Sequence, residues 1–320
     1  MKPFISLVIA LFLVSISARE SVYGQAKPQV NSLPVIKFEQ DGPASAKFVM
    51  PEHVESFEDA QFVFHNYYRA ANPELLVPVL RSYISSGDLK NFGALPPVCA
   101  FVSRIFAQFP QRIPAWVKAL EPMPAFARDN LLLVALEWTD CREARDAASI
   151  LERDGAVLPA GLPLVNLDAS SLSTDFVITS ASHIDMLWGA FWATGDRRYV
   201  EKIIAITPWA KEGVAPQVLS SRSMVEKSKD NSLLAQIERE FLGQDNEERE
   251  DVLKAQEEAK SRIAMTKRVL GETAIWSLSA NARKHSLVRS ICRDAMKANS
   301  MYAASLGHVI GDEAAPAPNQ

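Results

Sequence analysis

The chain has 320 residues, of which 48% are hydrophobic and 22% are charged, so it can build a sizeable core inside a soluble globular domain. Its formal net charge of -4 at pH 7 provides no basic face for nucleic acid, and we expect no nucleic-acid partner. With only 13 glycines and no sustained alternation of apolar and polar residues, the sequence argues against an all-β fold.

The N-terminus has the pattern of a secretory signal peptide. Lys2 supplies a positive charge, and the apolar run 4–14 (FISLVIALFLV) has the length of a signal-peptide core. Small residues follow, so we expect residues 1–18 to be removed by cleavage after Ala18, or after Ala26 at the latest. The run is short for a membrane-spanning helix, so the prediction is export to the periplasm or outside the cell, with no stable membrane span after cleavage. The alternative is an uncleaved signal anchor that tethers the protein to a membrane.

A helix–turn–helix pattern occurs twice. The first copy is 62–80 (FVFHNYYRAANPELLVPVL) and the second is 186–204 (MLWGAFWATGDRRYVEKII). The copies share few identities, but each has an aromatic-rich helix, a short polar turn and an amphipathic second helix. Equivalent positions hold residues of the same class, such as Tyr67-Tyr68 and Phe191-Trp192, Asn72 and Asp196, and Leu76 and Val200.

Further segments define the expected domain. A third, weaker hairpin is predicted at 129–151. Residues 27–53 lack helical periodicity and are predicted to be a linker. The segment 157–174 contains many helix breakers, which makes it the candidate for a subdomain break. We therefore expect helical hairpins over 54–305, in one domain or in two closely packed halves.

The C-terminal part is more charged. Asp230–Leu242 is predicted to be a helix with one apolar face, followed by a long helix from Asp245 to about Ala280 with acidic residues early and basic residues late. A last helix is predicted over Ser286–Ser300. Residues 306–320 are predicted to be a disordered tail.

No motif defines a reaction class, and we assign no catalytic residue. The nearest candidate is a cluster of Ser180, Ser182, His183 and Asp185 just before the second hairpin. Side chains two positions apart on a helix point away from each other, so His183 and Asp185 cannot pair locally. The simpler interpretation is a helix start capped by one of the serines. An enzyme of unrecognised class using Ser182, His183 and Asp185 is the alternative.

The histidines and cysteines do not predict a metal site or a cofactor. The five histidines are isolated, and none has a second ligand at the spacing of a helical zinc site. Phosphate-binding and dinucleotide-binding glycine motifs are absent. The three cysteines, Cys99, Cys141 and Cys292, lie in or beside apolar helical patterns and are expected to act as small hydrophobic residues.

The aromatic residues that recur in the two hairpins are the candidates for binding. Such residues most often join neighbouring helices in a core. In the functional interpretation they line a concave groove, where Tyr and Trp bury an apolar partner and keep a polar tip in water. Arginines near the hairpin turns would add contacts to carboxylates. The candidate binding residues are Tyr67, Tyr68, Trp188, Phe191, Trp192, Arg69 and Arg197.

The two aromatic hairpins, each with a short turn of small residues that ends in Asn72 or Asp196, and the late segment Trp276–His285 (WSLSANARKH) resemble bacterial exported proteins with tetratricopeptide-like helical hairpins. The full tetratricopeptide spacing is not met. The resemblance implies an all-α, α-solenoid-like fold of irregularly stacked hairpins and no catalytic residues.

We therefore predict an exported all-α scaffold, more a binding protein than an enzyme, that holds a protein or peptide partner in an aromatic-lined groove. A structural subunit of an envelope assembly is a further alternative, which would carry an apolar patch on one outer face. The identity of the partner and the oligomeric state stay open.

Overall fold

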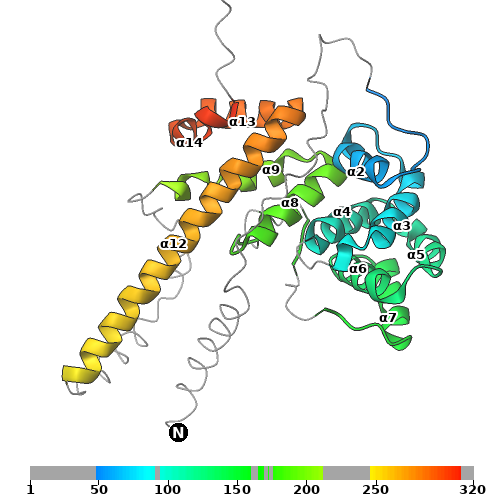
Figure 1. Ribbon diagram of the computed structural model, residues 1–320, viewed down its shortest axis with the longest axis horizontal. Helices are drawn as coiled ribbons and strands as arrows, with labels where there is room; N and C mark the ends of the chain where they lie inside the picture. The colour runs from blue at the N-terminus through cyan, green and yellow to red at the C-terminus, as the bar shows by residue number, and fades with distance from the viewer. Residues whose placement is uncertain are drawn as a thin grey trace, which may run out of the picture. The chain divides into compact units, whose positions relative to one another are not determined.

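The computed structural model describes residues 48–90, 94–159, 165–168, 172, 176–211 and 246–310, which all belong to one compact unit, Lys47–Gln320. These residues form α-helices and 3-10 helices and contain no β-strand (Figure 1), which confirms the predicted all-α class for the described part of the chain. The predicted signal peptide, most of the predicted linker and the predicted helix Asp230–Leu242 lie outside the described residues.

The α-helices of the described residues are α2 (Phe57–Asn66), α3 (Leu76–Ser86), α4 (Leu95–Gln108), α5 (Ile113–Leu120), α6 (Ala125–Glu137), α7 (Arg142–Arg153), α8 (Ala181–Thr194), α9 (Arg197–Ile204), α12 (Asn246–Lys284), α13 (Ser286–Ala298) and α14 (Ser300–Ile310). Short 3-10 helices connect several of them: η1 (Tyr67–Arg69), η2 (Pro73–Leu75), η3 (Asp88–Lys90), η4 (Pro110–Arg112) and η5 (Thr207–Ala210).

The first predicted hairpin is formed by α2 and α3. A capping box begins α2, in which the Asp59 backbone N–H donates to Ser56 Oγ at 3.0 Å and the Ser56 N–H donates to Asp59 Oδ2 at 2.9 Å. At the turn, the side chain of Asn72 accepts a hydrogen bond from the Glu74 N–H at 3.1 Å, and Pro73 begins η2. Gly87 ends α3 in the left-handed conformation, with φ of 81°.

The second predicted hairpin is formed by α8 and α9 and uses an equivalent cap. Gly195 ends α8 with φ of 69°, and the Asp196 side chain accepts from the Arg198 N–H at 3.0 Å. Asn72 and Asp196 thus form the same kind of capping bond, Asn72 at the start of η2 and Asp196 at the start of α9. The hairpins differ around the turn, where the first copy has η1 before Asn72 and η2 after it, whereas α8 stays α-helical to Thr194.

The long-range packing of the domain centres on α4 and α8, which lie side by side (Figure 1). Most of their side chains are buried. Gly189 permits the close approach, because a Cβ atom there would lie 2.0 Å from the carbonyl oxygen of Pro97. Three helices, α5 to α7, separate α4 from α8 along the chain.

The packing of α8 differs from that of an ideal α-solenoid, in which each repeat contacts its neighbours in the sequence. α8 also contacts α2 and η1, so the two copies of the hairpin pattern pack against each other across a large sequence separation. Helical hairpins are present, but nearest-neighbour stacking does not describe this helix.

The third predicted hairpin corresponds to α6 and α7. α7 buries the small stripe Ala144, Ala147, Ala148 and Leu151. The described parts of the segment 157–174 pack onto the domain, since Leu167 is buried and its carbonyl accepts hydrogen bonds from Arg104 Nη1 at 3.0 Å and from the Tyr199 hydroxyl at 2.7 Å. Residues on both sides of this segment belong to the same compact unit.

The C-terminal helices pack around the end of α12 (Figure 1). The stripe Leu270, Ala274, Leu278 and Ala282 is buried. η5 lies against α12 at Gly271, where a Cβ atom would be 2.3 Å from the Ala210 backbone nitrogen. α13 and α14 contact each other and α12.

The predicted boundaries at the C-terminus are corrected by the structure. The helix predicted over Ser286–Ser300 corresponds to α13, but it is not the last one, because Asn299 is extended and its Oδ1 accepts from the Met301 N–H at 2.9 Å to begin α14. α14 runs through Ile310, and Leu306 and Val309 are buried. A tail that begins at residue 306 is therefore wrong, since the helical domain continues past residue 305.

Candidate functional site

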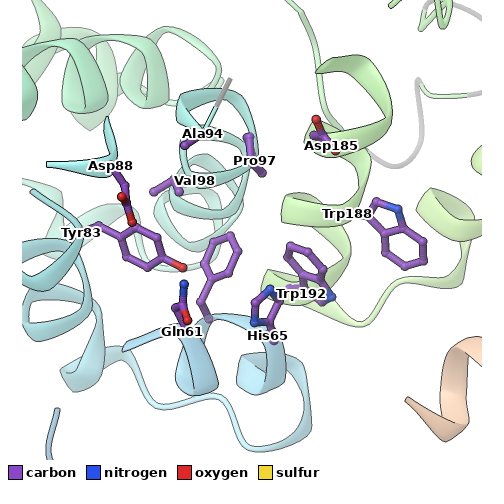
Figure 2. A pocket seen from close by; sticks show the side chains of 11 residues that line it. Gln61, His65, Tyr83, Asp88, Ala94, Pro97, Val98, Asp185, Trp188 and Trp192 are labelled. Atoms are coloured by element: carbon purple, nitrogen blue, oxygen red, sulfur yellow. The ribbon is translucent and has the colours of Figure 1, made fainter. Parts of the chain in front are cut away.

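A cavity of about 310 Å³ lies between α2, α3, η3, α4 and α8, and we call it the α2–α8 pocket (Figure 2). Helical spacing explains its walls, because α2 and α8 each present residues three or four positions apart on one face. The volume suits a small ligand or one side chain of a partner. The pocket is lined by Gln61, Phe64, His65, Tyr83, Asp88, Ala94, Pro97, Val98, Asp185, Trp188 and Trp192.

Packed aromatic rings form much of the wall. The Phe64 and Trp192 rings are 5.1 Å apart between centroids in an edge-on arrangement, and Phe64 and Tyr83 are 5.4 Å apart. Trp188 stacks on Trp192 at 6.0 Å. These ring contacts lie within the chain itself, so the wall is formed without a ligand.

Asp185 places a carboxylate at this aromatic wall. No hydrogen bond or ion pair of its side chain is found among the described residues. Asp185 is exposed at the surface of α8, and partial desolvation by its packed neighbours raises the pKa of its carboxyl from 3.8 to about 6. A second carboxylate, Asp88, lines the pocket from η3.

The other ionisable side chains of the pocket are neutral at pH 7. Burial lowers the pKa of His65 to about 4, and electrostatic interactions with His285 and Lys284 add to the shift. The His65 ring packs edge-on to Trp192 at 4.4 Å. Burial also raises the pKa of Tyr83, with Asp88 adding to the shift.

The aromatic residues predicted to bind a partner lie in different environments. Trp188 and Trp192 line the α2–α8 pocket. Tyr67 and Phe191 are fully buried in the core. Tyr68 is half-buried, packs on Phe191, and its hydroxyl lies 3.2 Å from Nδ1 of the buried His285. The five residues therefore do not line one groove.

The two predicted arginines lie outside the pocket. The Arg69 guanidinium lies over the Phe48 ring, 3.8 Å from its centroid. Arg197 is exposed and forms ion pairs with Glu201 at 2.7 Å and with Asp294 at 3.3 Å. Both side chains already have partners within the chain.

The residues of the alternative catalytic cluster are not brought together. The His183 Nδ1 accepts a hydrogen bond from the Thr179 N–H at 3.1 Å, and its ring packs on Phe176. Ser180 occupies the position before α8 but forms no side-chain capping bond. Asp185 alone of this cluster lines the pocket (Figure 2).

Several lining residues were missed by the sequence analysis, although a signal for two of them exists. If the two copies of the hairpin pattern are extended backward by one position, Gln61 corresponds to Asp185, and Phe64 already corresponds to Trp188. The pocket therefore lies where equivalent positions of the two copies face each other. Nothing in the sequence points to Asp88, Tyr83 or Pro97, because their place depends on the tertiary packing of α3, η3 and α4.

Other features of the described residues add no second site. No group of three or more His, Cys, Asp or Glu side chains there could hold a metal ion. Cys99, Cys141 and Cys292 are unpaired, and burial raises the pKa of the Cys292 thiol to about 12. None of the helices described has the length and apolar character that crossing a membrane requires.

Comparisons with protein-family models, with curated proteins and with solved structures find no significant match to this chain.

Proposed function

We propose that this protein is an exported helical binding protein that receives part of a protein or peptide partner in the α2–α8 pocket. The observation that carries the proposal is a preformed cavity with packed aromatic walls and an unpaired carboxylate, Asp185. Concave sites with a few convergent polar groups are the usual form of a binding site.

A binding role is favoured over catalysis because the polar groups of the pocket do not form a reacting set. The His65 ring is packed against Trp192, and no nucleophile is found beside a base among the described lining residues. A catalytic cluster would need such a pair within hydrogen-bond reach.

Site-specific photocrosslinking in cells tests the binding role. We would place a photoreactive amino acid at Gln61, on the pocket wall, and at the exposed Glu152 of α7 as the matched control. The expected result is a discrete crosslinked partner from position 61 that is absent from position 152 and is lost when Trp192→Ala is added to a folded protein. Equal crosslinking from both positions, or none from position 61, would contradict the proposal.

Export is tested separately by the mass of the mature chain. The apolar run 4–14 supports removal of a signal peptide, so protein recovered from the periplasm or the medium should begin at residue 19, or at residue 27 at the latest. A full-length chain in the membrane fraction would instead support the signal anchor.

A structural subunit of an envelope assembly is the second candidate, and one observation favours it. Met265, Val269 and Trp276 are 70%, 51% and 73% exposed, and their spacing places them along one side of α12. If this side joins copies or subunits, sedimentation of the full chain should show a concentration-dependent assembly that Trp276→Ser dissolves. A monomer at all concentrations and in cell crosslinking would exclude this role.

A further inference from the structure

The described wall of the α2–α8 pocket carries negative charge without a balancing cation. Asp88 and Asp185 contribute carboxylates from η3 and α8, and Figure 2 shows them on opposite sides of the α4 residues that line the pocket. No lysine or arginine is among the lining residues that the structure describes. His65 is neutral at pH 7 and adds no positive charge. An anionic ligand would therefore be repelled, and a cationic one attracted.

The indole N–H groups of the two lining tryptophans are not available to a ligand in the cavity. Nε1 of Trp188 and Nε1 of Trp192 are both shielded from solvent and have no hydrogen-bond partner among the described residues. The pocket is open to water-sized molecules, so these nitrogens do not face a ligand inside it. The tryptophans of the wall therefore offer no donor to a carbonyl or a carboxylate, whereas aromatic rings attract a cation through their negative π faces.

These observations together define a ligand class. We propose that the α2–α8 pocket recognises an alkylammonium group, held between the Asp185 carboxylate and the surrounding aromatic rings. The cavity of about 310 Å³ accepts one such side chain but not a folded segment. The inference rests on the proposed function, and in a protein or peptide partner the alkylammonium group is that of a lysine side chain.

The charge state of Asp185 links binding to protons. Its pKa of about 6 reflects desolvation without a compensating charge. A cation bound beside the carboxylate favours its ionised form, so the pKa falls on binding and protons are released near pH 6. A neutral ligand of the same shape would release none.

Titration of the full chain with n-butylammonium chloride, which carries the same chain and charge as a lysine side chain, tests the inference. The readout is the set of indole N–H signals in nuclear magnetic resonance, with those of Trp188 and Trp192 assigned from single Trp→Phe variants. The neutral control ligand is 1-butanol. We expect saturable shifts of the Trp188 and Trp192 signals with n-butylammonium, and binding by 1-butanol at least about ten-fold weaker.

Two variants locate the charge that matters. Asp185→Asn should weaken n-butylammonium binding by about ten-fold or more, while Asp154→Asn, which changes an exposed carboxylate at the end of α7, should leave it unchanged. Asp88→Asn provides a second test from the other wall if Asp185→Asn alters the fold. Equal binding of 1-butanol, or no shift of either indole signal up to about 100 mM n-butylammonium, would overturn the inference.

The outcomes separate this inference from the function on which it rests. A partner captured at position 61 whose crosslinking survives acetylation of its lysines would keep the proposed function and overturn the lysine assignment. Selective n-butylammonium binding without any macromolecular partner would keep an alkylammonium site and overturn the protein-binding role. Loss of crosslinking on acetylation, together with selective n-butylammonium binding, is the expected result.

Discussion

Gly189 allows α8 to approach the backbone of α4 at Pro97. A Cβ atom at this position would lie 2.0 Å from a carbonyl oxygen, and a backbone atom cannot move aside as a flexible side chain can. Gly189→Ala should therefore lower the free energy of unfolding by about 1–3 kcal/mol, measured by urea denaturation.

Gly307→Ala is the matched control for this substitution. Gly307 lies in α14, and a Cβ atom added there would have no neighbour within 4 Å. Alanine at this position should therefore be neutral, or should stabilise the chain by up to about 1 kcal/mol through its higher helix propensity. If the two variants have the same stability, the close approach of α8 to α4 is not a constraint.

The ionisable residues whose pKa values are shifted in the folded chain predict how its stability depends on pH. The pKa of His65 and the pKa of His285 are about 4 in the folded chain, below the ordinary 6.5, so the unfolded chain binds more protons and stability falls as the pH drops from about 6.5 to 4. His183 is shifted in the same direction. Asp185 opposes them, because its folded pKa of about 6 exceeds 3.8 and its contribution to stability is lost as the pH rises through 6.

Asp185→Asn should therefore stabilise the chain at pH 7 and have little effect near pH 4, where the carboxyl is protonated in the folded state. The decline of stability between these pH values becomes steeper in the variant, as urea midpoints at several pH values would show. Asp154→Asn serves as the control and should follow the unmodified protein. A gain in stability that is equal at pH 7 and pH 4 would contradict the assignment of the shifted pKa to Asp185.

At the scale of helices, Asp196 defines the start of α9. Its side chain accepts the Arg198 N–H at 3.0 Å and is also paired with the Arg198 guanidinium. Asp196→Ala should cost about 1 kcal/mol of unfolding free energy, whereas Asp196→Asn keeps an N-cap acceptor and should cost only a few tenths. Thermal unfolding of both variants measures the difference. Equal losses would mean that the charge and not the cap is what matters.

The helices that could be predicted are those with local signals. Ser56 and Asp59 begin α2, and Gly87 and Gly195 end α3 and α8, because caps depend on residues a few positions apart. α14 was missed although Asn299 is a capping residue, since Gly307 and the small residues around it give a weak apolar stripe. Its burial depends on contacts with α12 and α13, which no local pattern contains.

At the scale of the whole molecule, the sequence predicts which segments are helical but not which helices meet. The α4–α8 contact joins segments separated by three helices, and the pocket exists only because of it. Trp188 and Trp192 could be selected as candidates from the repeat, but Asp88 and Tyr83 become part of the site only through tertiary packing. The aromatic residues shared by the two hairpins therefore indicated part of the site, but they do not line one groove as predicted.

One continuous cluster of buried side chains includes residues from α2 to α14. Tyr68 of η1 and His285 before α13, whose side chains meet at 3.2 Å, link the two ends of the described chain within it. We therefore expect the domain to unfold as one cooperative unit, so that a destabilising substitution at one end also lowers the stability of the other end.

Gly271→Ala tests this expectation, because a Cβ atom there would lie 2.3 Å from the Ala210 backbone nitrogen and would separate η5 from α12. Native-state hydrogen exchange should show that the slowest amides of α4 lose as much protection as those of α12, since both exchange through global unfolding. If α12 to α14 exchange faster while α4 keeps its full protection, the C-terminal helices form a separate unit. In that case the α2–α8 pocket would persist without them, and n-butylammonium binding by the Gly271→Ala variant would be unchanged under conditions in which α12 to α14 are open.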